Sequence, residues 1–256
     1  MFKKLVIVLS LTFIPSLTAQ GFTNKLTGSY YSEGGNVDYN YFNATWSTEI
    51  QGSIQLGDLK LDDTEFLFSV SHSRSDYNKK PYENDAHGIL KLDLWANKTF
   101  SPFMFSEIEF DSTQGLDNRT NVGIGAKYRV LGDLFSISYA FMYENEKYVG
   151  WPADTFTRHS LRPKLKAQLT EGVFLQSQLF FKPTVNDLEV YLIDWQNGLS
   201  IETKAKWLTV EIQYQYKYNT DPAIKSYELD DQGNKINEKY YQKEDVMTTI
   251  GLSITL

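Results

Sequence analysis

Apolar and polar side chains alternate one by one along most of this chain. A period of two places successive side chains on opposite faces of a β-strand, so each run predicts a strand with one apolar and one polar face. In the clearest run, Leu208, Val210, Ile212, Tyr214, Tyr216 and Tyr218 alternate with Thr209, Glu211, Gln213, Gln215 and Lys217. Similar runs cover residues 42–50, 90–94, 122–130, 135–143 and 161–169.

These runs predict about twelve strands, many of them longer than the strands of soluble sheets. A tilted strand crosses a bilayer with about 9–11 residues, whereas strands of soluble proteins usually contain about 5–6. One predicted strand, 187–203, carries apolar residues on both faces, which a bulge or a misplaced boundary would explain. The predicted strands cover residues 23–33, 37–55, 64–77, 87–98, 102–112, 119–130, 134–145, 157–169, 172–182, 187–203, 206–218 and 245–256.

The connections between the predicted strands alternate between short turns and longer polar loops, the latter at 78–86, 113–118, 146–156 and 219–244. Short periplasmic turns and longer external loops are typical of outer-membrane barrels. We therefore expect an all-β, twelve-stranded, antiparallel, up-and-down transmembrane β-barrel over residues 20–256, with both termini in the periplasm. Its exterior would contact outer-membrane lipid and lipopolysaccharide. The alternative is a soluble sandwich with an aromatic core.

Aromatic side chains on the predicted outer face lie toward the strand ends. Their partly polar rings suit the headgroup level of a membrane, where they would form two girdles. The residues are Phe110, Tyr139, Tyr143, Phe181, Trp207, Tyr214 and Tyr218.

Residues 1–19 have the pattern of a secretory signal peptide. Lys3 and Lys4 precede an apolar stretch at 5–14 that is too short to span a bilayer as a helix. Pro15 and the tripeptide Leu17-Thr18-Ala19 then provide a helix break and a cleavage site. The alternatives are a membrane anchor and a buried N-terminal strand.

The last predicted strand resembles the C-terminal assembly signal of outer-membrane barrels. Thr249, Gly251, Ile254 and Leu256 occupy its polar, glycine and two apolar positions, with Leu256 in place of the usual terminal aromatic residue. The resemblance implies that this strand closes the barrel and that the barrel assembly machinery recognises it.

Composition narrows the function. The net charge of -7 argues against binding to nucleic acid, whose phosphates require a basic surface. The chain has no cysteine, which excludes disulfides, thiolate metal sites and a lipoprotein anchor. A mean hydropathy of -0.39 is compatible with a membrane barrel, because polar side chains facing the lumen dilute the apolar exterior.

Charged residues of both signs fall on the predicted lumen face. They could pair and plug the barrel, which would then have a structural role, or line a narrow porin-like path for small polar or anionic solutes. Two basic strands, one with Arg162, Lys164 and Lys166 and the other with Lys127 and Arg129, could attract an anion, although we favour their pairing with Glu107, Glu109, Glu202 and Glu211. The pore-lining candidates are Lys91, Asp93, Glu107, Glu109, Lys127, Arg129, Arg162, Lys164, Lys166, Glu202, Glu211 and Lys217.

An outer-membrane lipid hydrolase is the competing function, since a strand-borne His-x-Ser arrangement activates serine in such enzymes. None of the three histidines, His72, His87 and His159, has a serine two residues later, so we predict no catalytic residues, and no metal or cofactor. A third function is surface binding or adhesion through 219–244. That loop contains a calcium-like acidic run at 230–234, but we favour a hairpin that turns at Gly233.

Four segments, in the right order, resemble the salt-stress-induced outer-membrane proteins, a β-barrel family of unknown function. They are Gly35-Asn36-Val37-Asp38, Gly123-Ile124-Gly125-Ala126-Lys127-Tyr128-Arg129, Tyr218-Asn219-Thr220-Asp221-Pro222 and Thr248-Thr249-Ile250-Gly251-Leu252. The resemblance implies a barrel in the outer membrane of a Gram-negative bacterium. It brings no catalytic residues, and its name implies induction by salt stress.

Overall fold

The computed structural model of the protein describes residues 16–33, 38–56, 59–205, 207–230, 232 and 235–255. Most of the predicted signal peptide, residues 1–15, lies outside this part of the chain, as do Gly233 and Leu256. Residues 16–19 form the start of the first strand and pair with residues 52–55 of the second. The signal peptide and its cleavage site therefore stay predictions.

The described residues form fourteen strands, and none of them belongs to a helix that is long and apolar enough to cross a membrane. The barrel strands are β1 (Ser16–Glu33), β2 (Tyr39–Leu56), β3 (Leu59–Tyr77), β4 (Lys80–Asp93), β5 (Phe100–Asp111), β6 (Leu116–Leu131), β7 (Phe135–Tyr148), β8 (Ala153–Thr170), β9 (Val173–Pro183), β10 (Tyr191–Glu202), β11 (Leu208–Asn219) and β14 (Glu244–Thr255). The other two are β12 (Ile224–Leu229) and β13 (Lys235–Tyr240).

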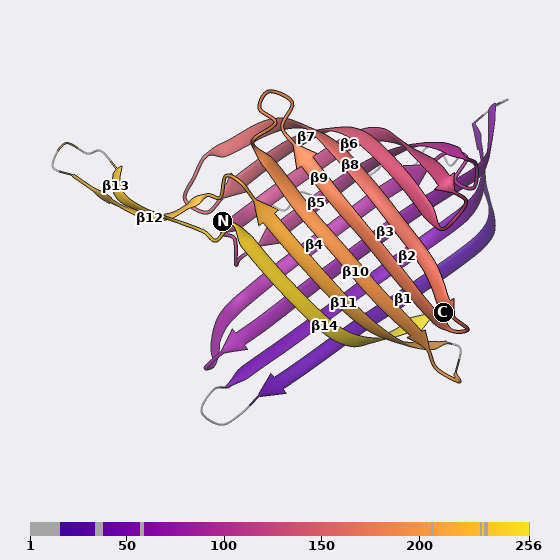
Figure 1. The fold of residues 1–256 in the computed structure, drawn as a ribbon, viewed down its shortest axis with the longest axis horizontal. Helices are drawn as coiled ribbons and strands as arrows, with labels where there is room; N and C mark the ends of the chain where they lie inside the picture. The colour runs from indigo at the N-terminus through magenta and orange to yellow at the C-terminus, as the bar shows by residue number, and fades with distance from the viewer. Residues whose placement is uncertain are drawn as a thin grey trace.

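The twelve longer strands close into one barrel in which each strand pairs antiparallel with its neighbours in the chain (Figure 1). The ring is completed where β14 pairs with β11 on one side and with β1 on the other. β12 and β13 form a separate hairpin that projects from the barrel between β11 and β14. The predicted twelve-stranded antiparallel barrel is thus confirmed, as is a hairpin within 219–244.

The two ends of the barrel carry different parts of the chain. We call the end from which β12 and β13 project the hairpin end, and the opposite end the terminal end. β1 begins and β14 ends at the terminal end, because the two strands are antiparallel and Lys25 of β1 pairs with Thr255 of β14. The start of β1 and the end of β14 therefore share one end of the barrel. Which side of a membrane that end faces stays a prediction.

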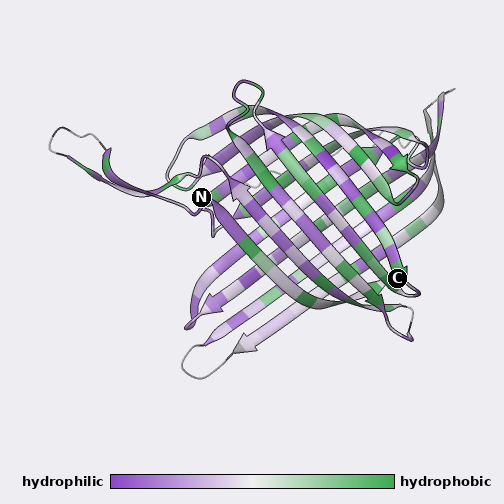
Figure 2. Cartoon of the chain, in the orientation of Figure 1, coloured by the Kyte–Doolittle hydropathy of each residue, from purple (hydrophilic) through white to green (hydrophobic). Residues whose placement is uncertain are grey.

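Side chains on each strand alternate between the outer surface and the interior, as the sequence pattern predicts. In β7, the odd-numbered residues from 137 to 143 are 38–54% exposed, whereas the even-numbered residues from 138 to 144 are at most 4% exposed. Figure 2 shows apolar and polar positions alternating along strands across the whole visible wall. The apolar side chains therefore cover the outside of the barrel, and the interior is mainly polar.

The predicted strand 187–203 had a misplaced boundary. β10 begins at Tyr191, so Leu188 and Val190 lie in the connection after β9 and not on a second face of the strand. The outward positions of β10 start at Tyr191, which packs against Phe181 and Tyr218, and include Trp195.

Three of the predicted loops were wrong because strands continue past their apolar stretches, and one of them, 146–156, is reduced to the four residues between Tyr148 and Ala153. β3 and β4 are joined by a two-residue turn, Asn78 and Lys79, both with positive φ, and Tyr77 pairs with Lys80. Such a turn matches the twist of a hairpin. β6 likewise starts at Leu116, inside the predicted loop 113–118. The extensions are polar on both faces, so the alternation that marks a strand is absent there.

Candidate functional site in the lumen

The lumen is the part of the barrel where polar chemistry concentrates. All twelve predicted pore-lining candidates occupy inward positions, since their neighbours in sequence on the same strands point outward. They come from β4 (Lys91, Asp93), β5 (Glu107, Glu109), β6 (Lys127, Arg129), β8 (Arg162, Lys164, Lys166), β10 (Glu202) and β11 (Glu211, Lys217). Whether they line an open path stays a prediction, but their contacts divide them into paired and unpaired groups.

An ion-pair network occupies the lumen near the hairpin end. Arg119 of β6 lies 2.8 Å from Glu146, 3.0 Å from Glu109 and 3.8 Å from Glu144. Arg158 of β8 donates a 2.7 Å hydrogen bond from Nε to Oε1 of Glu144. Arg119, Arg158 and Glu144 are nearly or fully buried, so water does not solvate their charges. The charges are instead stabilised by one another.

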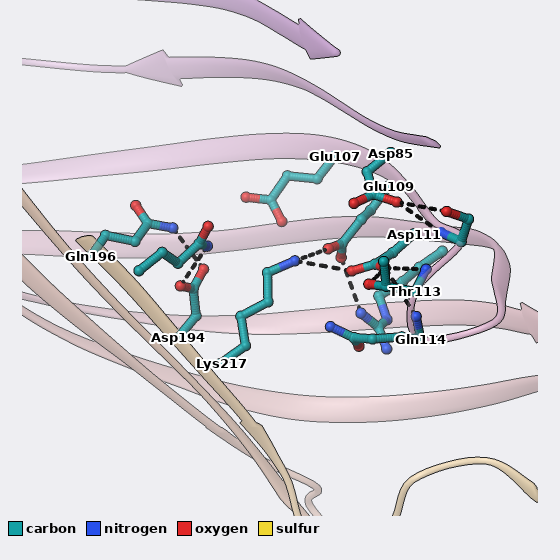
Figure 3. Close-up of polar contacts among 12 residues, drawn as sticks. Asp85, Glu107, Glu109, Asp111, Thr113, Gln114, Asp194, Gln196 and Lys217 are labelled. Carbon is teal, nitrogen blue, oxygen red and sulfur yellow. Dashed lines mark hydrogen bonds and ion pairs between the residues drawn. The ribbon is translucent and has the colours of Figure 1, made fainter. Parts of the chain in front are cut away.

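Lys217 crosses the lumen and joins this network from the opposite wall. Its Nζ lies 3.0 Å from Oε1 of Glu109 and 3.4 Å from Oδ2 of Asp111, both on β5 (Figure 3). In the order of the closed barrel, β11 and β5 face each other across the ring. Thr113 and Gln114 hold Asp111 by donating their backbone N–H groups, each at 3.0 Å, to Oδ1. We call this Lys217–Glu109–Asp111 contact the crossbar.

A row of amide side chains follows the wall beside the crossbar. Gln215 of β11 and Gln196 of β10 donate hydrogen bonds of 2.8 and 2.6 Å to the carboxylate of Asp194. Gln178 of β9 donates in turn to Oε1 of Gln196 at 2.6 Å. In register, Gln178 lies opposite Lys164 of β8, so the amide row leads from the crossbar strand to the basic residues of β8.

β8 carries the basic residues that lack acidic partners. Within the described ranges, no carboxylate lies within ion-pair distance of Arg162, Lys164 or Lys166. Arg162 instead donates a 3.0 Å hydrogen bond to Oγ of Ser138 and lies 5.4 Å from the ring centre of Phe180. We call Arg162, Lys164 and Lys166 the cationic wall.

The favoured pairing of the cationic wall with Glu107, Glu109, Glu202 and Glu211 is therefore wrong. Glu109 pairs with Arg119 and Lys217, and Glu211 pairs with Lys25 at 2.6 Å. The tilt and stagger of the strands place these carboxylates beside other cations, and spacing within single strands does not reveal that placement.

Lys127 and Arg129 of β6 are paired, in contrast to the cationic wall of β8. Lys127 lies 3.6 Å from Asp93, which also contacts Lys91, and Arg129 pairs with Asp133 in the following turn. Asp93 is fully buried, so the two lysines compensate its charge.

Two glycines of β6 make room for aromatic rings inside this part of the lumen. A Cβ atom on Gly123 would lie 2.5 Å from the ring of Phe105, and one on Gly125 would lie 2.7 Å from the ring of Phe103. The rings thus lie directly on the β6 backbone. The Nζ of Lys91 is 4.9 Å from the ring centre of Phe103, a distance at which a cation is attracted to an aromatic face.

Several lumen residues were missed by the sequence prediction. Arg119, Glu144, Glu146 and Arg158 hold the hairpin-end network, and Lys25 forms the pair with Glu211. The alternation itself would have found the first four. Arg119 and Arg158 have the same parity as inward candidates on β6 and β8, and Glu144 and Glu146 have the parity opposite to the outward Tyr139 and Tyr143 of β7.

The predicted barrel-closing residues lie on β14. Thr249 and Gly251 face Gln213 and Glu211 of β11, and Ile254 lies opposite both Leu208 and Leu26. β14 therefore does close the ring. Recognition of this strand by an assembly machinery stays a prediction.

The two outward histidines do not form a serine–histidine pair. Nε2 of His72 lies 3.0 Å from Oδ1 of Asn84, and Nδ1 of His159 lies 2.6 Å from the hydroxyl of Tyr139. Neither contact contains the serine that a serine–histidine dyad requires.

The hairpin end also holds an aromatic cluster outside the lumen. The Nζ of Lys235 on β13 lies 3.8 Å from the ring centre of Trp151 and 4.9 Å from that of Tyr227. Nε1 of Trp151 donates a 3.3 Å hydrogen bond to the carbonyl oxygen of Ile224. These contacts attach the hairpin to the β7–β8 connection, and a role of 219–244 in adhesion stays a prediction.

Known proteins share this architecture at low sequence identity. The chain is similar to the NanC porin (12% identity, TM-score 0.46, covering 91% of this chain and 100% of that chain). It is also similar to the anion-selective porin from Comamonas acidovorans (9%, 0.39, 95% and 100%) and to the translocator domain of the autotransporter NalP from Neisseria meningitidis (13%, 0.39, 91% and 86%). At such low identities and TM-scores, these similarities assign no function to the chain.

Sequence comparison identifies a family whose description names no activity. No curated protein matches the chain. A family model described as "Protein of unknown function, DUF481" matches residues 29–254. The description does not mention salt stress, so that part of the resemblance stays a prediction.

Proposed function

This chain belongs to the DUF481 family, whose description assigns no activity, and we propose its role from the barrel itself. The protein is an outer-membrane β-barrel of a Gram-negative bacterium whose narrow lumen binds and admits small polar anions. The cationic wall attracts the anion, and the crossbar restricts the path at the hairpin end.

The outer surface supports a membrane location. Large apolar side chains are exposed on strand after strand, for example Trp46 at 48%, Met104 at 53% and Ile124 at 65%. Water would penalise a continuous apolar surface of this kind, whereas hydrocarbon accepts it. Closing the sheet into a barrel pairs the backbone groups within the wall, as a bilayer requires.

The orientation that we propose places the terminal end in the periplasm and the hairpin end outside the cell, in contact with lipopolysaccharide. Mild trypsin treatment of intact cells tests it, because Lys225, Lys235 and Lys239 lie on the exposed hairpin. Cleavage within 224–240 on intact cells is the expected result. Cleavage only after the outer membrane is permeabilised would reverse the orientation.

The observation that carries the proposed function is the cationic wall. The other basic groups named in the lumen, on β4, β6 and β11, each have a carboxylate partner, whereas Arg162, Lys164 and Lys166 have none among the described residues. Positive charge in a narrow, partly desolvated channel concentrates anions and repels cations. The neighbouring amide row offers donors and acceptors to a polar solute.

Reversal potentials in planar bilayers under a salt gradient test this proposal. We expect the wild-type barrel to prefer chloride over potassium, and the R162Q/K164Q/K166Q variant to lose most of that preference. The matched control is K225Q/K235Q/K239Q, which removes the same charge from the hairpin outside the lumen. Equal selectivity in the wall variant and the wild type would refute an anion path, and no conductance in any variant would favour a plugged barrel.

A further inference from the structure

The seam that closes the barrel is paired over only part of its length. β1 and β14 share four register pairs, which join residues 25–28 to residues 252–255. On its other side, β14 pairs with β11 along residues 244–254. Within the part of the chain that the structure describes, residues 244–251 of β14 therefore have no register partner on β1. This unpaired stretch, which we call the open seam, lies toward the hairpin end.

The pairing stops where two glycines meet. A Cβ atom on Gly251 would lie 2.7 Å from the carbonyl oxygen of Gly28 and 3.1 Å from Cβ of Ser29. The strands are thus in contact at this point, and their register pairs end there. The buried Oγ of Ser29 has no hydrogen-bond partner in the described structure. The paired part of the seam therefore ends at Gly28 and Gly251, and we call this point the fork.

The paired part of the seam is reinforced from inside. Lys25 of β1 reaches over β14 to Glu211 of β11, with Nζ 2.6 Å from Oε1. Ser200 of β10 donates a 2.6 Å hydrogen bond to Oε2 of the same carboxylate. This bridge ties the strands on both sides of β14 together at the terminal-end side of the fork. Any separation of the strands is thereby confined to the open seam.

Nothing in the register prevents the open seam from pairing. Continued without a shift, the pairing of Lys25 with Thr255 and Gly28 with Leu252 would bring Ser32 opposite Thr248. Unpaired backbone groups at membrane depth are costly, so pairing would be favoured unless another group occupies the seam. The seam can therefore exist in a paired and an open form.

The open seam lies beside the obstructed part of the lumen. Lys217, which forms the crossbar, pairs in register with Asp245 of the open stretch of β14. The outward residues of this strand include two exposed apolar side chains, Val246 at 56% and Ile250 at 66%. The crossbar thus narrows the axial path at the level where the open seam would lead from the polar lumen to an apolar surface.

We propose that the open seam is a lateral passage between the lumen and the bilayer for an anionic amphiphile, a molecule with an acidic head and an apolar tail. The cationic wall holds the head, which is the step that rests on the proposed function. The tail leaves through the open seam into hydrocarbon. The seam pairs when no tail occupies it.

Disulfide trapping in this cysteine-free chain tests the two forms of the seam. The S32C/T248C variant would cross-link only in the paired form, and the T27C/S253C control joins residues that are already partners. Because the seam pairs when no tail occupies it, we expect dodecanoate to slow the S32C/T248C cross-link at least about ten-fold and to leave the rate of the control cross-link unchanged. The same S32C/T248C rate with and without dodecanoate would mean that no tail opens the seam, and no cross-link at all would mean a seam that never pairs; either result overturns the proposal.

Block of the anion current by dodecanoate, compared with acetate, tests the passage. We expect dodecanoate to block the reduced S32C/T248C barrel, and the oxidised barrel to require at least about ten-fold more, with block restored by a reducing agent. Acetate should permeate both forms equally. Equal dodecanoate block in both forms overturns the lateral passage and leaves the proposed function intact. Loss of anion selectivity throughout would refute the proposed function, and the passage with it.

Discussion

The crossbar offers a direct test of whether the lumen is organised by charge. Replacing Lys217 by methionine keeps most of the side-chain volume and removes the cation that joins β11 to β5. Glu109 would retain Arg119 at 3.0 Å, whereas Asp111, which is 2% exposed, would retain only hydroxyl and backbone donors. The K217M variant should therefore be less stable and should have a wider path at the hairpin end.

The size of the effect follows from the geometry. Opposite unit charges 3.0 Å apart interact by about 5 kcal/mol at an effective dielectric constant of about 20. The side chains of Lys217 and Glu109 are 28% and 21% exposed, so water and the cost of desolvation reduce this value. We expect a coupling free energy of about 1–3 kcal/mol between the two residues.

A double-mutant cycle of K217M, E109Q and the combined variant, unfolded by urea in lipid vesicles, measures this coupling. Single-channel conductance of the same proteins measures the path, and K217M should conduct more than the wild type. The control cycle is K147M with D117N, an ion pair of 2.6 Å whose side chains are 49% and 44% exposed and whose coupling should stay below about 1 kcal/mol. Equal coupling in the two cycles, together with unchanged conductance, would refute the crossbar.

Three other variants test separate parts of the structure. G125V should destabilise the barrel by about 1–3 kcal/mol, because its Cβ would meet the carbonyl oxygen of Tyr139 and lie 2.7 Å from the Phe103 ring. An unchanged urea midpoint would contradict the packing of that ring on β6. R119M leaves a cluster of carboxylates without its central cation and should cost about 3–5 kcal/mol in the same assay, whereas a neutral result would show that these carboxylates are protonated or hydrated. Removing 224–240 and joining the ends with a short Gly-Ser linker should leave the heat-modifiable mobility of the barrel on SDS gels unchanged, since β12 and β13 form their own sheet; loss of the folded band would show that the hairpin supports the barrel.

The sequence by itself determined which side chains of each barrel strand face outward and which face the lumen. A period of two assigns each residue of a strand to one of two faces, and neither the partner strand nor the stagger changes that assignment. For this reason the inward positions of Lys91, Glu109 and Lys164 and the outward positions of Tyr139 and Ile250 followed from alternation alone. Strand ends such as 80–86 were missed because both faces are polar there and the period disappears.

The tertiary structure alone decided which inward charges meet. Lys217 and Glu109 are 108 residues apart, and they touch because the closed ring sets their strands opposite each other at one height. The same stagger leaves Lys164 opposite Gln178 and without a carboxylate partner among the described residues. The position of a residue along the barrel axis depends on the register of every strand pair around the ring. A pattern within one strand therefore cannot predict it.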